Sequence, residues 1–125
     1  MKNQIAFLAL SALAVTALTA CGGSDKAPSY QADIKPLIDA KCVSCHVPGG
    51  EGYEKSGLRM DSYEALMKGT RFGAVVVPGS SVSSTMYRLV SGQADPSIRM
   101  PHGQAALPDA EVAMIAAWID QGAKY

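Results

Sequence analysis

The most reactive side chains of this chain gather in one short stretch, CVSCH at residues 42–46. In a helical turn, Cys42 and Cys45 are three positions apart and fall on one side, so both sulfurs can meet the two vinyl groups of one porphyrin. His46 follows directly and can ligate the porphyrin iron, which is the arrangement used for covalent haem attachment. The same residues also fit half of a zinc site or a dithiol redox pair, so the rest of the chain has to separate these chemistries.

An iron bound by His46 needs a second protein ligand or an open position on its other side. Met100 is the preferred candidate, because a thioether is the ligand of high-potential electron-transfer haems and Pro101 stiffens the backbone directly after it. His102 is the alternative, since imidazole also binds haem iron. A zinc site would need more ligands than His102 and carboxylates supply, and a thioredoxin-like dithiol would need a βαβ unit that the sequence does not predict. The remaining methionines are expected to be structural: Met60, Met67, Met86 and Met114.

The N-terminus has the pattern of an export signal. Lys2 precedes an uncharged apolar run at residues 5–18, which is shorter than the ~20 residues that a bilayer-spanning helix needs. The run ends in LTAC, which resembles the lipobox of bacterial lipoproteins and implies cleavage before Cys21 and attachment of lipid to its sulfur. The alternative is an ordinary signal peptide cut after Ala20, with Cys21 as an incidental thiol.

These features predict three parts: a signal peptide at 1–20, a lipidated cysteine with a flexible tether at 21–29, and one domain at 30–125. The lipobox resemblance implies export to the periplasmic side and anchoring in a membrane, with the outer membrane favoured because Gly22 follows the cysteine. The 3 cysteines are then accounted for, one by lipid and two by haem. With 11 basic and 11 acidic residues the charge balances, so no basic field predicts a nucleic-acid partner.

The elements that must position the motif are predicted to be helical. Apolar residues at helical spacing lead straight into Cys42, and a capping pattern at 61–64 opens a helix that Gly69 closes. The last helix starts at Pro108, with Pro and acids in its first turn. We expect four helices, at about 30–41, 62–68, 83–90 and 108–121, separated by loops at 47–57, 73–79 and 91–107. The segment at 73–79 is expected to be a buried loop, because a single strand would have no partner. The fold class is therefore all-α.

The motifs together resemble the cytochrome c family, and the resemblance covers nearly all of residues 30–125. CVSCH follows an N-terminal helix, and RMP at 99–101 precedes a C-terminal helix that carries IAAWI at 115–119. More narrowly, GLRMDS at 57–62, VVPGS at 76–80 and WIDQGA at 118–123 are similar to the cytochrome c-like modules of planctomycete-type proteins. The resemblance implies that the first and last helices cross near the haem, with these residues at the contact: Tyr30, Ile34, Ile115 and Trp118.

The chain is thus expected to be a one-electron carrier rather than an enzyme. It would hold one covalent haem c, with His46 and Met100 as axial ligands, and would meet its electron donor and acceptor proteins transiently. Arg71 and Arg99 are the candidates for pairing with the haem propionates, and a backbone carbonyl in the 47–49 loop is expected to orient the His46 ring. The alternative is a haem-based sensor of small molecules or a peroxidase-like enzyme, in which the second ligand is displaced.

Overall fold

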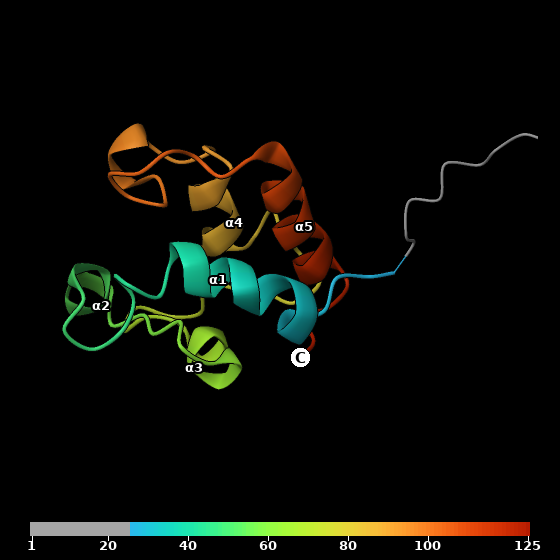
Figure 1. Ribbon diagram of the computed structural model, residues 1–125, viewed down its shortest axis with the longest axis horizontal. Coiled ribbons are helices and arrows are strands. Elements are labelled where there is room, and N and C mark those ends of the chain that lie inside the picture. The colour runs from blue at the N-terminus through green and yellow to red at the C-terminus, as the bar shows by residue number, and fades with distance from the viewer. Residues whose placement is uncertain (1–25) are drawn as a thin grey trace, which may run out of the picture.

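The computed structural model describes residues 26–125, which form a small helical domain (Figure 1). In chain order the elements are a π-helix η1 (Tyr30–Ile34), α1 (Lys35–Lys41), α2 (Glu51–Ser56), α3 (Tyr63–Lys68), α4 (Thr85–Val90), a 3-10 helix η2 (Pro96–Ile98) and α5 (Asp109–Asp120). Within that described part there is no β-strand, only an isolated bridge between Thr70 and Gly73. The prediction of an all-α domain is confirmed. The predicted signal peptide and Cys21 lie outside the described residues.

The helix that leads into the cysteine motif is held at its start by a reciprocal cap. The Ser29 hydroxyl accepts a hydrogen bond from the Ala32 amide at 3.2 Å, and the Asp33 carboxylate accepts one from the Ser29 amide at 2.8 Å. η1 then continues into α1, where Pro36 lies at the first turn. A proline cannot donate to the carbonyl four residues back, and the wider π-turn of η1 accommodates it.

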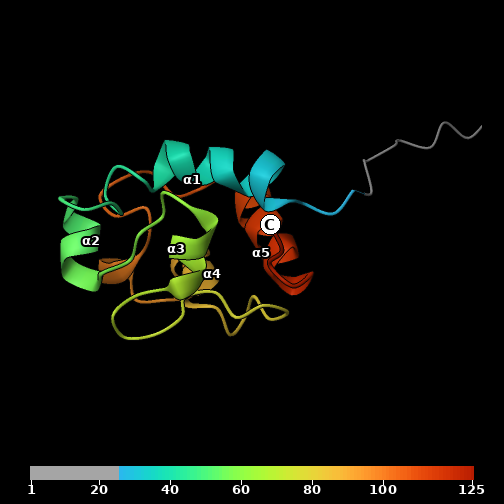
Figure 2. The ribbon, with the colours of Figure 1, turned by 90° about the horizontal axis from the view of Figure 1, so that it is seen from below.

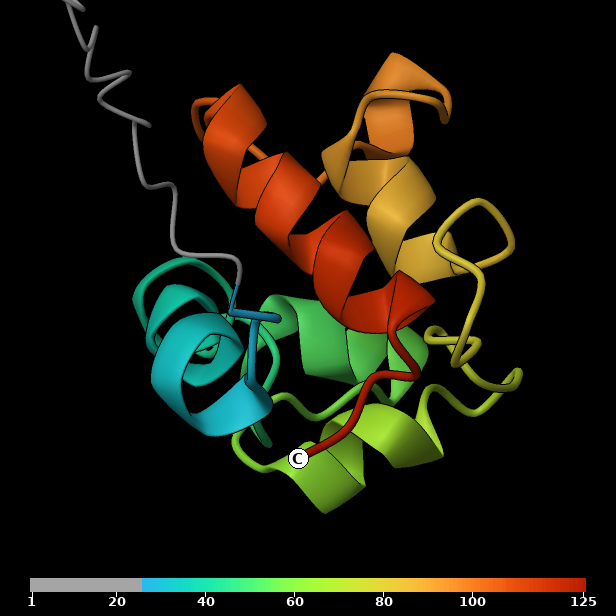
Figure 3. The same ribbon diagram turned by 90° about the vertical axis from the view of Figure 1, so that its right-hand side faces the viewer.

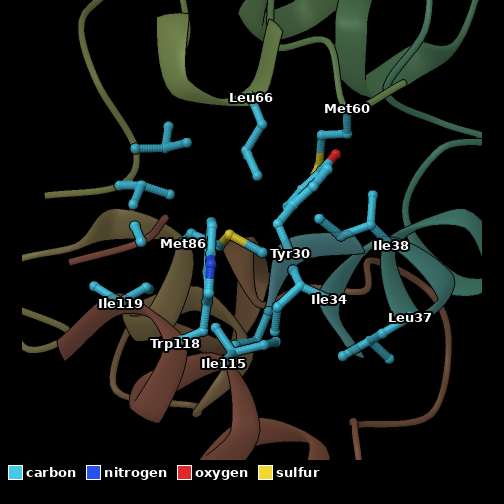
Figure 4. Close-up of a cluster of buried hydrophobic side chains, with 14 of the residues drawn as sticks. Tyr30, Ile34, Leu37, Ile38, Met60, Leu66, Met86, Ile115, Trp118 and Ile119 are labelled. Atoms are coloured by element: carbon cyan, nitrogen blue, oxygen red, sulfur yellow. The ribbon is translucent and has the colours of Figure 1, made fainter. Parts of the chain in front are cut away.

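The core forms where this first helix crosses the last one. Tyr30 and Ile34 of η1 contact α5, and the Tyr30 and Trp118 ring centroids lie 5.9 Å apart. Figure 4 shows Trp118 and Ile115 pointing toward Ile34. These three side chains and that of Tyr30 are each at most 1% exposed. The crossing that the family resemblance implied is therefore present, with the predicted residues at the contact.

The segment at 47–57 was expected to be a loop, and this prediction is wrong for its second half, which is α2. The helix begins after an extended Gly50 and ends at Gly57, whose φ of +75° places it in the left-handed region that glycine adopts without strain. Glu51 and Lys55 pair at 2.6 Å across one turn, which supports a helix too short to be stable alone. The sequence prediction assigned these glycines to a loop, whereas Gly50 and Gly57 mark the two ends of a helix.

The segment at 73–84 connects α3 to α4 and contacts the end of α5. Val75 and Val76 are buried without forming a strand, as predicted. The buried Ser84 hydroxyl accepts from the Val77 amide at 2.8 Å, and the Ser81 amide donates to the Asp120 carboxylate at 2.6 Å. This segment therefore links α4 to the end of α5, and these two helices lie side by side (Figure 3).

No helix among residues 26–125 is long and apolar enough to cross a membrane. Figure 2 shows that η2 and α2 lie at the same end of the domain, with α5 toward the other end. The cysteine motif comes directly after α1, so it lies at the same end of the domain as α2 and η2.

Candidate haem site

The cysteine motif continues the helical path of α1 for one more turn. The Cys42 amide donates to the Ile38 carbonyl at 2.8 Å, and the His46 amide donates to the Cys42 carbonyl at 3.1 Å. Cys42 is half-buried, Cys45 is exposed, and both thiols are free. The local structure thus has the helical turn that the spacing predicted.

Both thiols and the imidazole lie on the wall of one predominantly apolar cavity of about 430 Å³. That volume is in the range of cofactor pockets, ~300–1,000 Å³. The apolar part of the wall comes mainly from α4 and the loops around it: Leu58, Val75, Met86, Leu89, Val90 and Ile98. An apolar wall that also carries thiol, imidazole and thioether groups fits a haem.

His46 is only 9% exposed, and its Nδ1 atom is buried without a hydrogen-bond partner of normal geometry. Burial lowers the pKa of this imidazole, and the backbone carbonyl of Leu58 opposes that shift. Burial therefore favours the neutral imidazole, which is the form that ligates a metal. The carbonyl that acts on the ring belongs to Leu58, whereas the sequence had pointed to the 47–49 loop.

The alternative chemistries of the motif gain no support from this geometry. Burial, and then the neighbouring Cys45, raise the pKa of the Cys42 thiol to about 11, whereas redox-active dithiols need a lowered pKa. Among residues 26–125, no three histidine, cysteine or acidic side chains come together as a metal site would require. A structural zinc ion needs four such ligands, so these residues do not fit it.

Met100 and His102 both reach the wall of the same cavity, so the structure brings both candidates for the second ligand to the site. Met100 is half-buried, and its amide donates to the Leu89 carbonyl at 3.2 Å, which fixes its loop to the end of α4. His102 is exposed and lies near Glu51, whose carboxyl pKa is lowered mainly by Lys55 and least by His102. His102 therefore lies toward the rim, facing α2.

Two methionines that were expected to be structural also line the cavity. Met60 and Met86 are buried at 4% and 7% exposure, and both belong to the core as predicted. Their second role at the cavity wall could not be found from helical spacing, because it depends on where α4 lies relative to residues 58–60. The site thus has three thioethers on its wall, of which Met100 is the least buried.

Neither predicted propionate partner lines this cavity. The Arg71 guanidinium donates to the Glu54 carbonyl at 2.6 Å and lines a separate cavity of about 570 Å³ between α2 and α3, which meets the first one at Thr70. Arg99 is half-buried beside Met100. The cations that do line the first cavity are Lys41 and Lys55, which the sequence analysis did not select.

Trp118 and Tyr30 are also absent from the cavity wall. Trp118 instead donates from Nε1 to the Lys124 carbonyl at 2.8 Å and packs against Tyr30. The aromatic of the last helix, which the resemblance placed near the haem, therefore lies in the core next to the site rather than on its wall.

Comparison with protein families gives one match, to the family described as planctomycete cytochrome C, over residues 42–103. The matched segment is about half of the chain; it begins at the first cysteine of the motif and ends three residues after Met100. Comparisons with curated proteins and with solved structures give no match. The family match, the helical fold and the cavity formed by both thiols and the imidazole agree, and the chain belongs to the cytochrome c-like family.

Proposed function

We propose that this protein carries single electrons on one covalently attached haem c. The observation that carries the proposal is that two free thiols, a buried imidazole and a thioether line one apolar cavity. These four groups are what covalent attachment and six-coordinate ligation require. A haem in this position would supply a one-electron ferrous/ferric couple.

Cys42 and Cys45 would hold the porphyrin. Each thiol would add across one vinyl group, with a sulfur–carbon bond formed and the thiol proton transferred to the other vinyl carbon. The addition is redox-neutral and needs no oxidant, in contrast to disulfide formation between the same two thiols. Because the two sulfurs already line the same cavity, both thioethers can form on one porphyrin.

His46 and Met100 would be the axial ligands. His46 offers a nitrogen that burial keeps unprotonated, and the Met100 thioether is a soft ligand that raises the reduction potential. With both ligands in place no position is open to a substrate, which favours electron transfer over catalysis. Contacts with donor and acceptor proteins would be small and transient.

The alternative function is a haem-based sensor or a peroxidase-like enzyme. It is favoured by two observations: Met100 is carried by a loop, and His102 lies on the same cavity wall. If Met100 dissociated, His102 would be a nearby acid or base. The two functions differ in the spin state of the resting ferric protein.

The lipid anchor at Cys21 is proposed from the sequence alone. The lipobox-like LTAC before Cys21 supports cleavage there, lipid on the Cys21 sulfur and anchoring on the periplasmic side, with the outer membrane favoured. Incorporation of labelled palmitate into the wild-type chain but not into Cys21→Ser tests this part separately. A labelled Cys21→Ser protein would contradict it.

The ligand pair is tested with the haem-loaded protein from a host that matures c-type cytochromes. We expect low-spin α and β bands on reduction and, in the ferric form, the weak long-wavelength band of methionine ligation. Met100→Ala removes this band and keeps the covalent haem, whereas His102→Ala, Met60→Ala and Met86→Ala retain it. If the band survives in Met100→Ala, the assigned ligand is wrong. High-spin ferric haem in the wild type supports the alternative function, and a chain without haem rejects both.

A further inference from the structure

α2 lies against the face of the His46 ring, at a distance that leaves no room for a side chain. A Cβ atom added at Gly52 would lie 2.7 Å from His46 Cε1, 2.9 Å from Nε2 and 3.0 Å from Nδ1. Its nearly equal distances to these three atoms place Gly52 over the ring. The backbone of α2 thus takes the place of a packing side chain next to the imidazole.

α2 cannot easily retreat from this contact, because its first turn is bonded to the cysteine motif. The Tyr53 amide donates to the Cys45 carbonyl at 2.9 Å, and the Gly50 amide donates to the Val47 carbonyl at 2.8 Å. Gly50 is also crowded, since a Cβ there would lie 2.5 Å from the Cys45 oxygen. The helix is therefore fixed to the backbone on which His46 is mounted.

The His46 backbone is fixed too, whereas its ring has only the Leu58 carbonyl beside it and no hydrogen bond of normal geometry. The His46 amide donates to the Cys42 carbonyl at 3.1 Å, and its carbonyl accepts from the Met60 amide at 2.9 Å. The ring nitrogen Nδ1 has no hydrogen-bond partner of normal geometry. Packing against Gly52 is then the close contact that restricts rotation of the imidazole.

We propose that Gly52 is a positioning residue that sets the rotation of the His46 imidazole about its side-chain bonds. The proposal rests on the proposed function of His46 as a haem ligand. The plane of an axial imidazole determines the direction of unpaired electron density on a ferric haem, so Gly52 acts on the haem through His46. A methyl group at this position forces either the ring or α2 to move.

The test is Gly52→Ala in the haem-loaded full chain, followed by proton NMR of the four haem methyl groups in the ferric form. We expect a rearranged pattern of methyl shifts, because that pattern follows the imidazole plane, together with a lower thermal midpoint. Alanine is ordinarily a better helix former than glycine, so a site without this contact would give a raised midpoint instead. An unchanged methyl pattern overturns the proposal.

Gly49→Ala is the matched control. Gly49 lies in the loop just before α2 with φ +88°, so alanine strains the backbone, but a Cβ there meets no atom within 4 Å. We expect a lower thermal midpoint with the wild-type methyl pattern. If Gly49→Ala rearranges the pattern as much as Gly52→Ala does, Gly52 has only a structural role and the proposal is wrong.

A measurement on the wild type covers the case in which Gly52→Ala does not fold. In the diamagnetic ferrous protein, the Gly52 Hα protons should show strong nuclear Overhauser effects to the His46 ring, and their absence overturns the contact. The visible spectrum separates this outcome from a failure of the proposed function. Without haem or without His46 ligation the function is wrong, while the Gly52 contact can still be measured in the same sample.

Discussion

The two ends of this small domain differ in how their interior space is filled. At the crossing of η1 and α5, Ile34, Ile115 and Trp118 are at most 1% exposed, and side chains of the chain itself fill the space. At the other end, between α2, α4 and the 91–107 loop, apolar side chains surround a cavity of about 430 Å³, and Ile98 on its wall is 52% exposed. The first region is a fully packed core, whereas the second is a cavity wall that the proposed cofactor would fill.

The difference also extends to the interactions that hold each region. The crossing gains an aromatic cluster in which Tyr30 lies 5.1 Å from Tyr63 and 5.9 Å from Trp118, centroid to centroid. On the cavity wall, the loop that carries Met100 is held by a backbone hydrogen bond from the Met100 amide to the Leu89 carbonyl. If most of the stability comes from the packed crossing of η1 and α5, the conformation of the other end can depend on its ligand.

The largest effect is expected from removing both thiols. In the double variant Cys42→Ala and Cys45→Ala, haem should be fully extractable from the denatured chain, because no thioether can form. Amide exchange in the 91–107 loop should become fast while Trp118 fluorescence stays that of a buried indole. Ser44→Ala, an exposed position between the two cysteines, should keep covalent haem. Equal loosening of both regions in the double variant would show that the comparison is mistaken.

Trp118→Ala tests the packed end. Removing a large core side chain that is 1% exposed should lower the free energy of unfolding by ~3–5 kcal/mol, measured by denaturant titration of the haem-loaded protein. Trp118→Phe keeps a ring but loses the hydrogen bond to the Lys124 carbonyl, so its effect should be smaller. Both variants should keep the wild-type visible spectrum, since Trp118 does not line the cavity. A changed axial ligation in Trp118→Ala would contradict the separation of the two regions.

Ser84→Ala tests the segment that joins them. The Ser84 hydroxyl is fully buried, accepts from the Val77 amide and donates to the Ser80 carbonyl, each at 2.8 Å. Losing it should lower the free energy of unfolding by ~1–3 kcal/mol. Ser83→Ala is the control, because Ser83 is exposed and should change stability by less than ~0.5 kcal/mol. Equal losses of stability in Ser84→Ala and Ser83→Ala would mean that the buried hydrogen bonds of Ser84 do not stabilise the fold more than an exposed serine does.

The smallest effect is expected for Tyr30→Phe, and it depends on pH. Burial, and then the nearby Asp39, raise the pKa of Tyr30 from its ordinary value of 10.0 to about 12. The unfolded chain therefore loses this proton first, and the wild type should lose stability as the pH rises from 10 toward 12. Because the hydroxyl has no hydrogen-bond partner, the phenylalanine variant should be nearly as stable at neutral pH and should decline less steeply above pH 10. Parallel curves of unfolding free energy against pH would refute the prediction.

Sequence patterns identified the α-helices that bury apolar side chains and missed α2, which buries none. The apolar spacing of η1, α1 and α5 follows from burial on one face, which a sequence records directly. α2 has no buried side chain, so it has no apolar stripe to record, and its glycines resemble those of a loop. Its position is set by hydrogen bonds to the cysteine motif and by the room that Gly50 and Gly52 leave.

The candidate site shows the same division. Cys42, Cys45 and His46 could be selected from the sequence because their chemistry depends on local spacing within one turn. Met60, Met86 and the lysines of the cavity wall could not, since they come from segments that meet only in the folded chain. Arg71 was selected by charge alone, yet its guanidinium is engaged by the end of α2.

The sequence by itself therefore determined the helical class, the attachment motif and the family, because each depends on residue types at fixed separations along the chain. Tertiary structure alone decided which side chains surround the cavity and that α2 rests on the His46 ring. It also decided that Trp118 belongs to the core instead of the cavity wall. These outcomes depend on how helices approach one another, which is set by packing over distances that local spacing does not encode.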